Sequence, residues 1–163
     1  MTEPPPAPFW LAHHYPEDYR RCYPIGSVRI CARCAGLYPA LLAGLALQIG
    51  LGATTRWPRE EWIVLALTLP AVADWAIGRF DPASGTNLIR SATGILLGVA
   101  LSRTIYLNMV HPANWLSVTH FAGLAVIAGI VEVLARPHRL RKRLERGGPL
   151  GVEGPKDFGG PRV

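Results

Sequence analysis

Four stretches of this chain are apolar over lengths that match a lipid bilayer, and they constrain the fold more than any other feature. They extend over about residues 30–53, 62–80, 91–110 and 115–135. A helix needs about 20 mostly apolar residues to cross about 30 Å of hydrocarbon. The sequence therefore predicts an all-α fold, an integral membrane bundle of four helices.

The composition and the connecting segments agree with this fold. Charged residues make up 17% of the chain, whereas about 25% of an average soluble protein is charged. The segments at 54–58, 81–85 and 111–114 are polar or rich in turn-forming residues. A chain of 163 residues is long enough for one domain and too short for two of ordinary size.

We expect three parts along the chain. Residues 1–29 form a short cytoplasmic segment rich in Cys and His, residues 30–135 form the four transmembrane helices, and residues 136–163 form a tail that is first basic and then rich in Gly and Pro. The basic part is expected to continue the last helix along anionic lipid head groups. No cleavable signal peptide is expected, because the amino end is acidic and Pro-rich and lacks a basic region.

The distribution of Lys and Arg predicts the orientation of the chain. The amino end, the second connection and the carboxyl end hold most of the 17 Lys and Arg residues, whereas the other side holds Arg56 and Arg59. Because cytoplasmic segments are enriched in Lys and Arg, we expect both termini in the cytoplasm of a bacterial inner membrane. The same bias accounts for the net charge of +6. We therefore expect the bilayer and its anionic lipids as partners, and no nucleic acid, since no nucleic-acid-binding motif accompanies the charge.

All three cysteines and two of the five histidines lie before or at the start of the first apolar run: His13, His14, Cys22, Cys31 and Cys34. Thiolate and imidazole are the ligands that Zn²⁺ and iron prefer. Cys31 and Cys34 have chelate spacing, and Cys22 can reach back to them through a turn at residues 24–26. Three thiolates and one imidazole complete a tetrahedral site, so we expect a Zn or Fe site here, with a structural role if all four ligands come from the protein.

Two alternatives remain open for these residues. Cys31 and Cys34 form a Cys-x-x-Cys pair, which would suit a quinone-linked thiol oxidoreductase, although the reducing cytoplasm and the missing second cysteine pair argue against it. The cysteines can also be small buried side chains at the start of a helix, with the histidines at the surface.

Ionisable residues inside the apolar runs are costly in lipid and mark candidate functional positions. In the topology above, Asp74, Asn87 and Arg90 come to one depth on the cytoplasmic side. Asp74 could act as a base or bind Mg²⁺, while Arg79 and Arg90 hold phosphate. This arrangement predicts a membrane enzyme acting on a lipid phosphate or a polyprenyl head group. The alternative is a structural Asp–Arg pair between helices.

Three further polar or small-residue features have structural explanations. Arg103 and Glu132 lie toward the ends of their spans and are expected to extend to the membrane surface. His120 is expected to hydrogen-bond a neighbouring helix rather than a metal. Gly94 and Gly98 form a small-residue face on which another helix can pack closely, with a homodimer as the minor alternative.

Several blocks of residues resemble one family. They are His13-His14-x-Pro16-Glu17, Cys31-Ala32-Arg33-Cys34-x-Gly36-x-Tyr38, Pro70-x-x-x-Asp74 and Asn87-x-x-Arg90-x-x-Thr93-Gly94. Over about residues 12–110 the chain resembles the domain-of-unknown-function 2085 (DUF2085) family of small bacterial and archaeal membrane proteins. The family's commoner form begins Cys-His-Gln, so His13 stands where a cysteine is usual, an exchange that keeps a metal ligand. The resemblance implies a multi-pass protein with a cysteine-rich cytoplasmic motif and no established activity.

Overall fold

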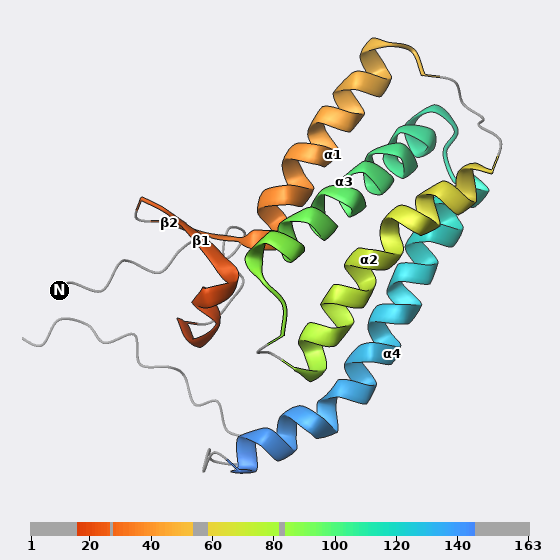
Figure 1. The fold of residues 1–163 in the computed structure, drawn as a ribbon. Helices are drawn as coiled ribbons and strands as arrows, with labels where there is room; N and C mark the ends of the chain where they lie inside the picture. Colours follow the sequence, from red (N-terminus) through yellow and green to blue (C-terminus); the bar gives the residue numbers. More distant parts are fainter. Residues whose placement is uncertain (1–15, 27, 54–58, 82–83, 146–163) are drawn as a thin grey trace, which may run out of the picture.

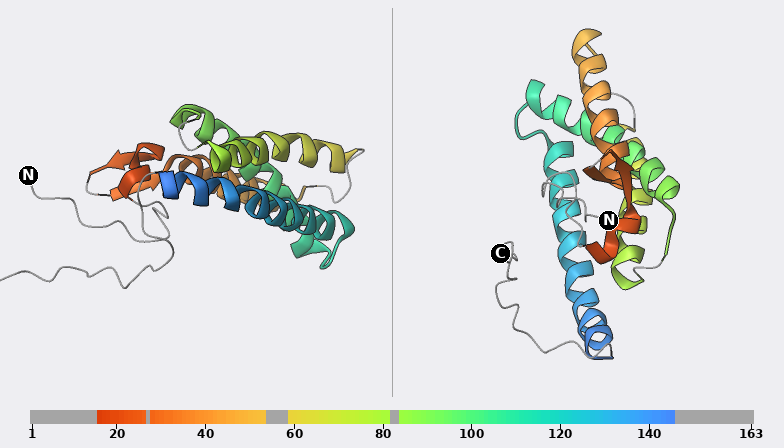
Figure 2. Two further views of the ribbon diagram at one scale, coloured as in Figure 1. Left: turned by 90° about the horizontal axis from the view of Figure 1, so that it is seen from below. Right: turned by 90° about the vertical axis from the view of Figure 1, so that its left-hand side faces the viewer.

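The structure, a computed structural model, describes residues 16–26, 28–53, 59–81 and 84–145 (Figure 1). In chain order its elements are a short 3-10 helix η1 (Pro16–Arg21), strands β1 (Cys22–Ile25) and β2 (Val28–Cys31), and helices α1 (Ala32–Gly50), α2 (Glu60–Phe80), α3 (Asn87–Val110) and α4 (Trp115–Glu145). Figures 1 and 2 show the strands and the last turns of α4 at the same end of the bundle, which we call the hairpin end.

All four helices are long and apolar enough to cross a membrane, α4 through its segment Trp115–His138. The predicted bundle of four membrane helices is confirmed. Three helices extend beyond the apolar runs, α2 by two residues at its start. Helix α3 begins at Asn87, where the Thr86 hydroxyl accepts a hydrogen bond from the Ile89 amide at 3.3 Å, and α4 continues to Glu145. Hydropathy marks the part of a helix that lies in lipid, whereas backbone hydrogen bonding continues beyond it.

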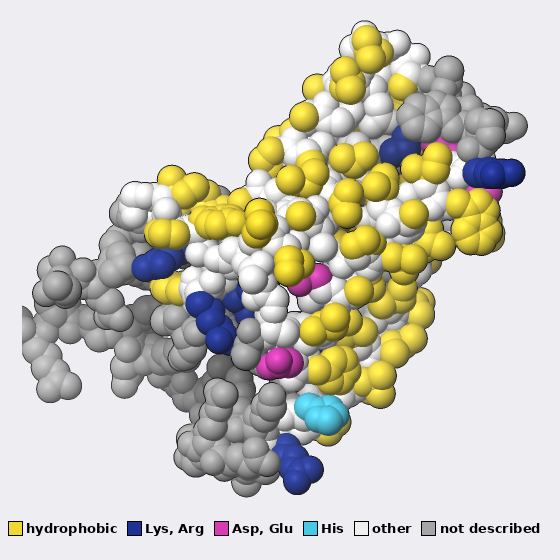
Figure 3. Space-filling view, in the orientation of Figure 1, with side chains coloured by type: hydrophobic (Ala, Val, Ile, Leu, Met, Phe, Trp, Pro, Cys, Tyr) yellow, Lys and Arg dark blue, Asp and Glu magenta, His cyan; other side chains and the backbone are white. Residues whose placement is uncertain are grey.

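Helix α3 lies at the centre of the bundle and contacts the other three helices, α1 most extensively. Of its span 50% is buried inside the protein, against 11% for α1 and for α4. The outer faces carry large apolar side chains such as Leu42, Trp62 and Trp115, and hydrophobic side chains cover most of the helical surface in Figure 3. In water such a surface would favour aggregation. A bilayer solvates it.

Close approach of α1 and α3 depends on glycine. A Cβ at Gly94 would collide with the carbonyl of Arg33, and a Cβ at Gly98 would collide with the carbonyl of Leu37. On the facing helix, a Cβ at Gly36 would collide with the backbone of α3. The predicted small-residue face is therefore confirmed, and its partner is α1. This contact sets the position of the first turns of α1 against those of α3.

A turn was expected at residues 24–26, and the structure has a β-hairpin formed by β1 and β2 around Gly26. The two strands are antiparallel, with Cys22 opposite Cys31 and Ile25 opposite Val28. The turn between them includes Gly26, whose φ of 59° lies in the left-handed region that glycine adopts without strain. Strand β2 leads directly into α1, so the hairpin is held at the entrance of the first membrane helix.

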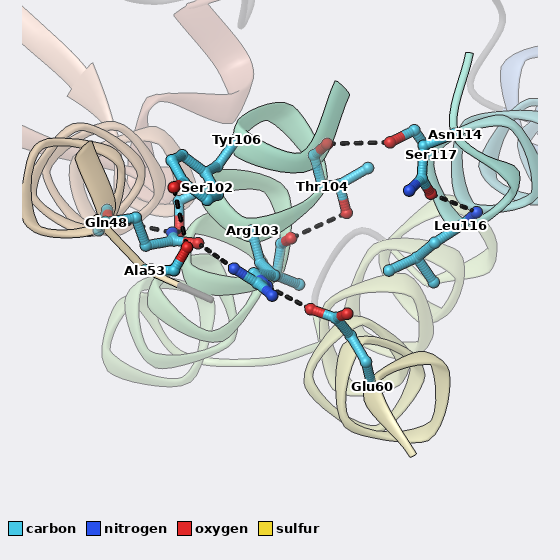
Figure 4. A network of polar contacts seen from close by, with 12 residues as sticks. Gln48, Ala53, Glu60, Ser102, Arg103, Thr104, Tyr106, Asn114, Leu116 and Ser117 are labelled. Atoms are coloured by element: carbon cyan, nitrogen blue, oxygen red, sulfur yellow. Dashed lines mark hydrogen bonds and ion pairs between the residues drawn. The ribbon is translucent and has the colours of Figure 1, made fainter. Parts of the chain in front are cut away.

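The expectation that Arg103 extends to the membrane surface is wrong. Its side chain is 7% exposed and forms an ion pair with Glu60 at the start of α2. The guanidinium also donates to Gln48 Oε1 at 3.3 Å and lies 5.7 Å from the ring centre of Tyr106. Gln48 in turn donates to Ser102 Oγ at 3.2 Å, which completes the network drawn in Figure 4. Helix α2 begins at Glu60, before the predicted span, so the Glu60 carboxylate lies within the bundle and can pair with Arg103.

His120 connects three helices, as the sequence analysis expected of a hydrogen-bonding role. Its Nε2 lies 3.0 Å from the Thr68 hydroxyl on α2, and its Nδ1 lies 2.8 Å from the Thr104 hydroxyl on α3. Each hydroxyl also donates to a carbonyl of its own helix. Both ring nitrogens of this α4 residue are thus engaged by hydroxyl groups.

Candidate functional site

Charged side chains from four elements meet at the hairpin end. Arg21 ends η1, Arg33 lies in the first turn of α1, Asp74 lies in the last third of α2, and Arg90 lies in the first turn of α3. We call these four residues the arginine cluster. They are separated by tens of residues in sequence and come together because α1 and α3 start where α2 ends (Figure 1).

Contacts within the cluster involve both side chains and backbone. Arg33 forms an ion pair with Asp74, whose side chain is 11% exposed. Arg90 is 7% exposed and donates to the Ser84 carbonyl. A Cβ on Gly85 would lie 3.4 Å from Asp74 Oδ1 and 3.5 Å from Arg90 Nη2, so the Gly85 backbone lies against both groups. Its φ of 76° is one that glycine adopts readily.

Two arginines of this cluster lie beside a single carboxylate. Asp74 pairs with Arg33, while Arg90, 7% exposed, hydrogen-bonds a backbone carbonyl and lies within electrostatic range of both side chains. Arg21 donates to the Gly78 carbonyl at 3.4 Å, one turn beyond Asp74 on α2. Like charges gathered away from bulk water repel each other strongly and are costly without counter-charges. The cluster therefore favours an anion.

Nε of Arg33 and Oδ1 of Asn87 are buried polar atoms of this region that have no hydrogen-bond partner among the described residues. Buried polar atoms are nearly always hydrogen-bonded, and exceptions mark a place where a ligand, an ion or water completes the structure. Arg33 Nε is a donor beside the Asp74 pair, so it is available to an anionic oxygen.

The three cysteines also gather at this end. Cys22 and Cys31 are each 4% exposed and face each other across the hairpin. The Cys34 thiol hydrogen-bonds Cys31 and lies within electrostatic range of Cys22. His13 and His14 lie outside the described residues. Within the described part of the chain, no three Cys, His, Asp or Glu side chains are arranged to hold a metal ion.

Arg33 connects the two groups of residues. In the sequence Arg33 lies between Cys31 and Cys34, and in the structure it pairs with Asp74. Ser91 fastens the same turn of α1, since its hydroxyl donates to the Ala32 carbonyl at 2.8 Å and lies 3.1 Å from the Tyr23 hydroxyl. Arginines interleaved with the cysteines were the sequence signal for this cluster, but the spacing alone did not indicate which acid they meet.

The remaining predicted residues lie at the edge of the site. Glu132 on α4 pairs with Arg79 at 3.0 Å, with side-chain exposures of 35% and 39%. Arg79 also lies 5.6 Å from the ring centre of Trp75. Asp74 and Glu132 are thus each paired with a different arginine. Asn87 is the first residue of α3.

Comparison with known proteins identifies the family. The model of a family described as "Predicted membrane protein (DUF2085)" matches residues 25–105. Over this region the chain belongs to DUF2085. No curated protein and no solved structure matches the chain.

The region that matches DUF2085 begins at the end of β1 and ends within α3. It includes three members of the arginine cluster, Arg33, Asp74 and Arg90, and the Cys31–Cys34 pair, whereas Cys22 precedes it. The family description names a membrane protein and no activity. The chain is a multi-pass membrane protein, and its chemistry must be inferred from the site itself.

Proposed function

We propose that this membrane protein binds the phosphate head group of a lipid at the hairpin end, through Arg33 and Arg90. The observation that supports the proposal is that these two guanidinium groups, of which Arg90 is buried, lie beside the single carboxylate of Asp74. The guanidinium fork matches phosphate oxygens and can donate two parallel hydrogen bonds to them. A phosphate would supply the missing negative charge and accept from the free Nε of Arg33.

An enzymatic form of this proposal gives Asp74 a second role. Acting on a lipid phosphate or a polyprenyl head group, Asp74 would serve as a base or as a ligand of Mg²⁺, while Arg90 holds the phosphate. In the structure Asp74 is engaged by Arg33, so its carboxylate becomes available when phosphate takes over Arg33. Binding is therefore the step that the geometry supports most directly.

The proposal also includes a location. The hairpin, the end of α2, the start of α3 and the basic extension of α4 carry most of the cationic residues. Segments rich in Lys and Arg face the cytoplasm in multi-pass proteins. We place the arginine cluster at the cytoplasmic face of a bacterial inner membrane, where lipid phosphates are abundant.

A titration with lipid tests the binding proposal. The full chain in mild detergent is titrated with dioleoyl phosphatidic acid or with dioleoyl phosphatidylcholine, and bound lipid is counted by native mass spectrometry. We expect preferential binding of phosphatidic acid, reduced about tenfold or more in Arg90→Gln because a charged hydrogen bond is lost. Arg59→Gln is the matched control, since Arg59 is an exposed cation at the start of α2, at the end of the bundle opposite the cluster. Equal binding of both lipids by the wild type would refute the proposal.

A second candidate function is the binding of Zn or Fe by the cysteines. What favours it is the approach of Cys22, Cys31 and Cys34 at the start of α1. Three thiolates accept either metal. The described cysteines are not arranged around an ion, so a metal would have to draw them together, with His13 or His14 as the fourth ligand. Such a closed site would fasten the hairpin to the first membrane helix.

Metal content tests this second candidate. Mass spectrometry of the purified protein is expected to find about one equivalent of Zn or Fe, lost in the Cys31→Ser/Cys34→Ser variant. Absence of metal from the wild type would contradict it. Alkylation of thiols in cells then tests the remaining alternative, a quinone-linked thiol oxidoreductase, which requires an oxidised Cys31–Cys34 population.

A further inference from the structure

A cavity of about 230 Å³ lies within the bundle, directly beside the arginine cluster. Its walls come from α2, α3 and α4 and include Ala71, Trp75, Leu97, Leu124 and Ala128. A water molecule occupies about 30 Å³ in the liquid, so the space admits roughly eight groups of the size of water or a methylene. An apolar space of this size gives water few partners and favours hydrocarbon.

Arg33 belongs both to this cavity and to the arginine cluster. Its side chain lines the cavity, and its guanidinium pairs with Asp74. On α2 the cavity is lined by Ala71, three positions before Asp74, and by Trp75, four positions after Ala71. Residues three and four positions apart lie on the same face of a helix. The face of α2 that lines the cavity therefore also carries the Asp74 carboxylate. On α4 the lining residue Ala128 remains exposed, so the cavity is open on that side.

We infer that this cavity holds one hydrocarbon chain of the lipid whose phosphate binds the arginine cluster, an inference that rests on the proposed function. The apolar walls of the cavity and the positive charge of the adjacent arginines together favour this occupant. A free phosphate ion would leave the apolar walls of the cavity unused, and a neutral hydrocarbon would leave Arg33 Nε without an acceptor. A chain attached to a phosphate satisfies both, with its head group at Arg33 and its first methylenes beside Trp75.

Two alkyl phosphates separate head-group binding from chain binding. Butyl phosphate and dodecyl phosphate carry the same head group on a short and a long chain. In wild-type protein we expect dodecyl phosphate to bind at least about tenfold more tightly than butyl phosphate, because its additional methylenes leave water. Affinities are measured by isothermal titration in a mild detergent, below the concentration at which the probe forms micelles.

A pair of matched variants then tests the cavity itself. Ala128→Phe places a ring in the cavity, whereas Ala125→Phe adds the same ring to an exposed position of α4 that does not line it. We expect Ala128→Phe to lower the affinity for dodecyl phosphate to that for butyl phosphate, with butyl phosphate binding unchanged. Ala125→Phe is expected to bind both probes as the wild type does. If Ala128→Phe binds dodecyl phosphate normally, the cavity assignment is wrong and head-group binding stands.

A second measurement covers the case in which the new ring disturbs folding. A brominated dodecyl phosphate quenches tryptophans that it touches, and we expect part of this quenching to disappear in Trp75→Phe. Equal quenching in wild type and Trp75→Phe would overturn the inference. If the wild type binds neither alkyl phosphate, the proposed function fails and the cavity assignment fails with it.

Discussion

The two ends of the bundle both bury arginine, and they do so in opposite ways. At the end opposite the hairpin, Arg103 meets Glu60, a charge pair with side-chain exposures of 7% and 10%, and Gln48 and Tyr106 surround the guanidinium. At the hairpin end, Arg33 and Arg90 lie beside the single carboxylate of Asp74, and Arg33 Nε has no partner among the described residues. A balanced, fully hydrogen-bonded pair connects helices, whereas two arginines beside one carboxylate favour a further negative charge.

The largest effect on stability is expected when the Arg103–Glu60 pair loses its negative charge. Glu60→Gln leaves Arg103 buried without a carboxylate and should lower the free energy of unfolding by about 3–5 kcal/mol. Unfolding in mixed micelles measures this loss. The double variant Glu60→Gln/Arg103→Met removes both charges and should recover most of the stability. A single variant as stable as wild type would mean that the network does not connect the helices.

The next largest effect concerns the contact that positions Arg33. Gly94→Ala introduces a Cβ against the Arg33 carbonyl and should destabilise the bundle by about 1–3 kcal/mol, while also weakening lipid phosphate binding. Gly123→Ala is the control, because a Cβ there meets nothing within 4 Å, and it should cost no stability. If both variants behave alike in unfolding and in lipid titration, the close contact between Gly94 and Arg33 does not position the arginine cluster.

A smaller effect on stability separates the unbalanced end from the balanced one. Arg90→Gln loses the bond to Ser84 but relieves repulsion among arginines, so the unliganded protein should lose only about 1 kcal/mol. Its lipid phosphate binding should nevertheless fall about tenfold. Thermal unfolding with and without phosphatidic acid measures both quantities. A loss of stability as large as that of Glu60→Gln would show that the cluster is a structural network.

The smallest effect is expected where charges are paired in contact with solvent or lipid head groups. The Arg79–Glu132 pair has side-chain exposures of 39% and 35%, and exposed pairs contribute at most about 1 kcal/mol. Arg79→Gln should therefore change the unfolding free energy by less than about 1 kcal/mol, and the difference should shrink in high salt. A larger loss of unfolding free energy that does not depend on salt would show that this pair stabilises the bundle as the buried Arg103–Glu60 pair does.

The chemistry of the candidate site was only partly visible in the sequence. Asp74 and Arg90 could be named because charged residues inside apolar runs are rare. The sequence did not indicate which arginine pairs with Asp74. Arg33 is 41 positions away from it, and the two residues meet only through helix packing. The burial of Arg103 was missed for the same reason, since its partner Glu60 precedes the apolar run.

The sequence by itself determined that this chain forms four membrane helices, because the cost of placing residues in lipid is local and adds up along about 20 residues. It also determined which residues carry reactive or ionisable groups. The tertiary structure decided which of them meet: hairpin register places Cys22 opposite Cys31, and the glycine contacts of α1 and α3 set the depth of Arg33 and Arg90. Ion pairs and cavities depend on the rotation and depth of neighbouring helices, which side-chain packing sets and local hydropathy does not encode.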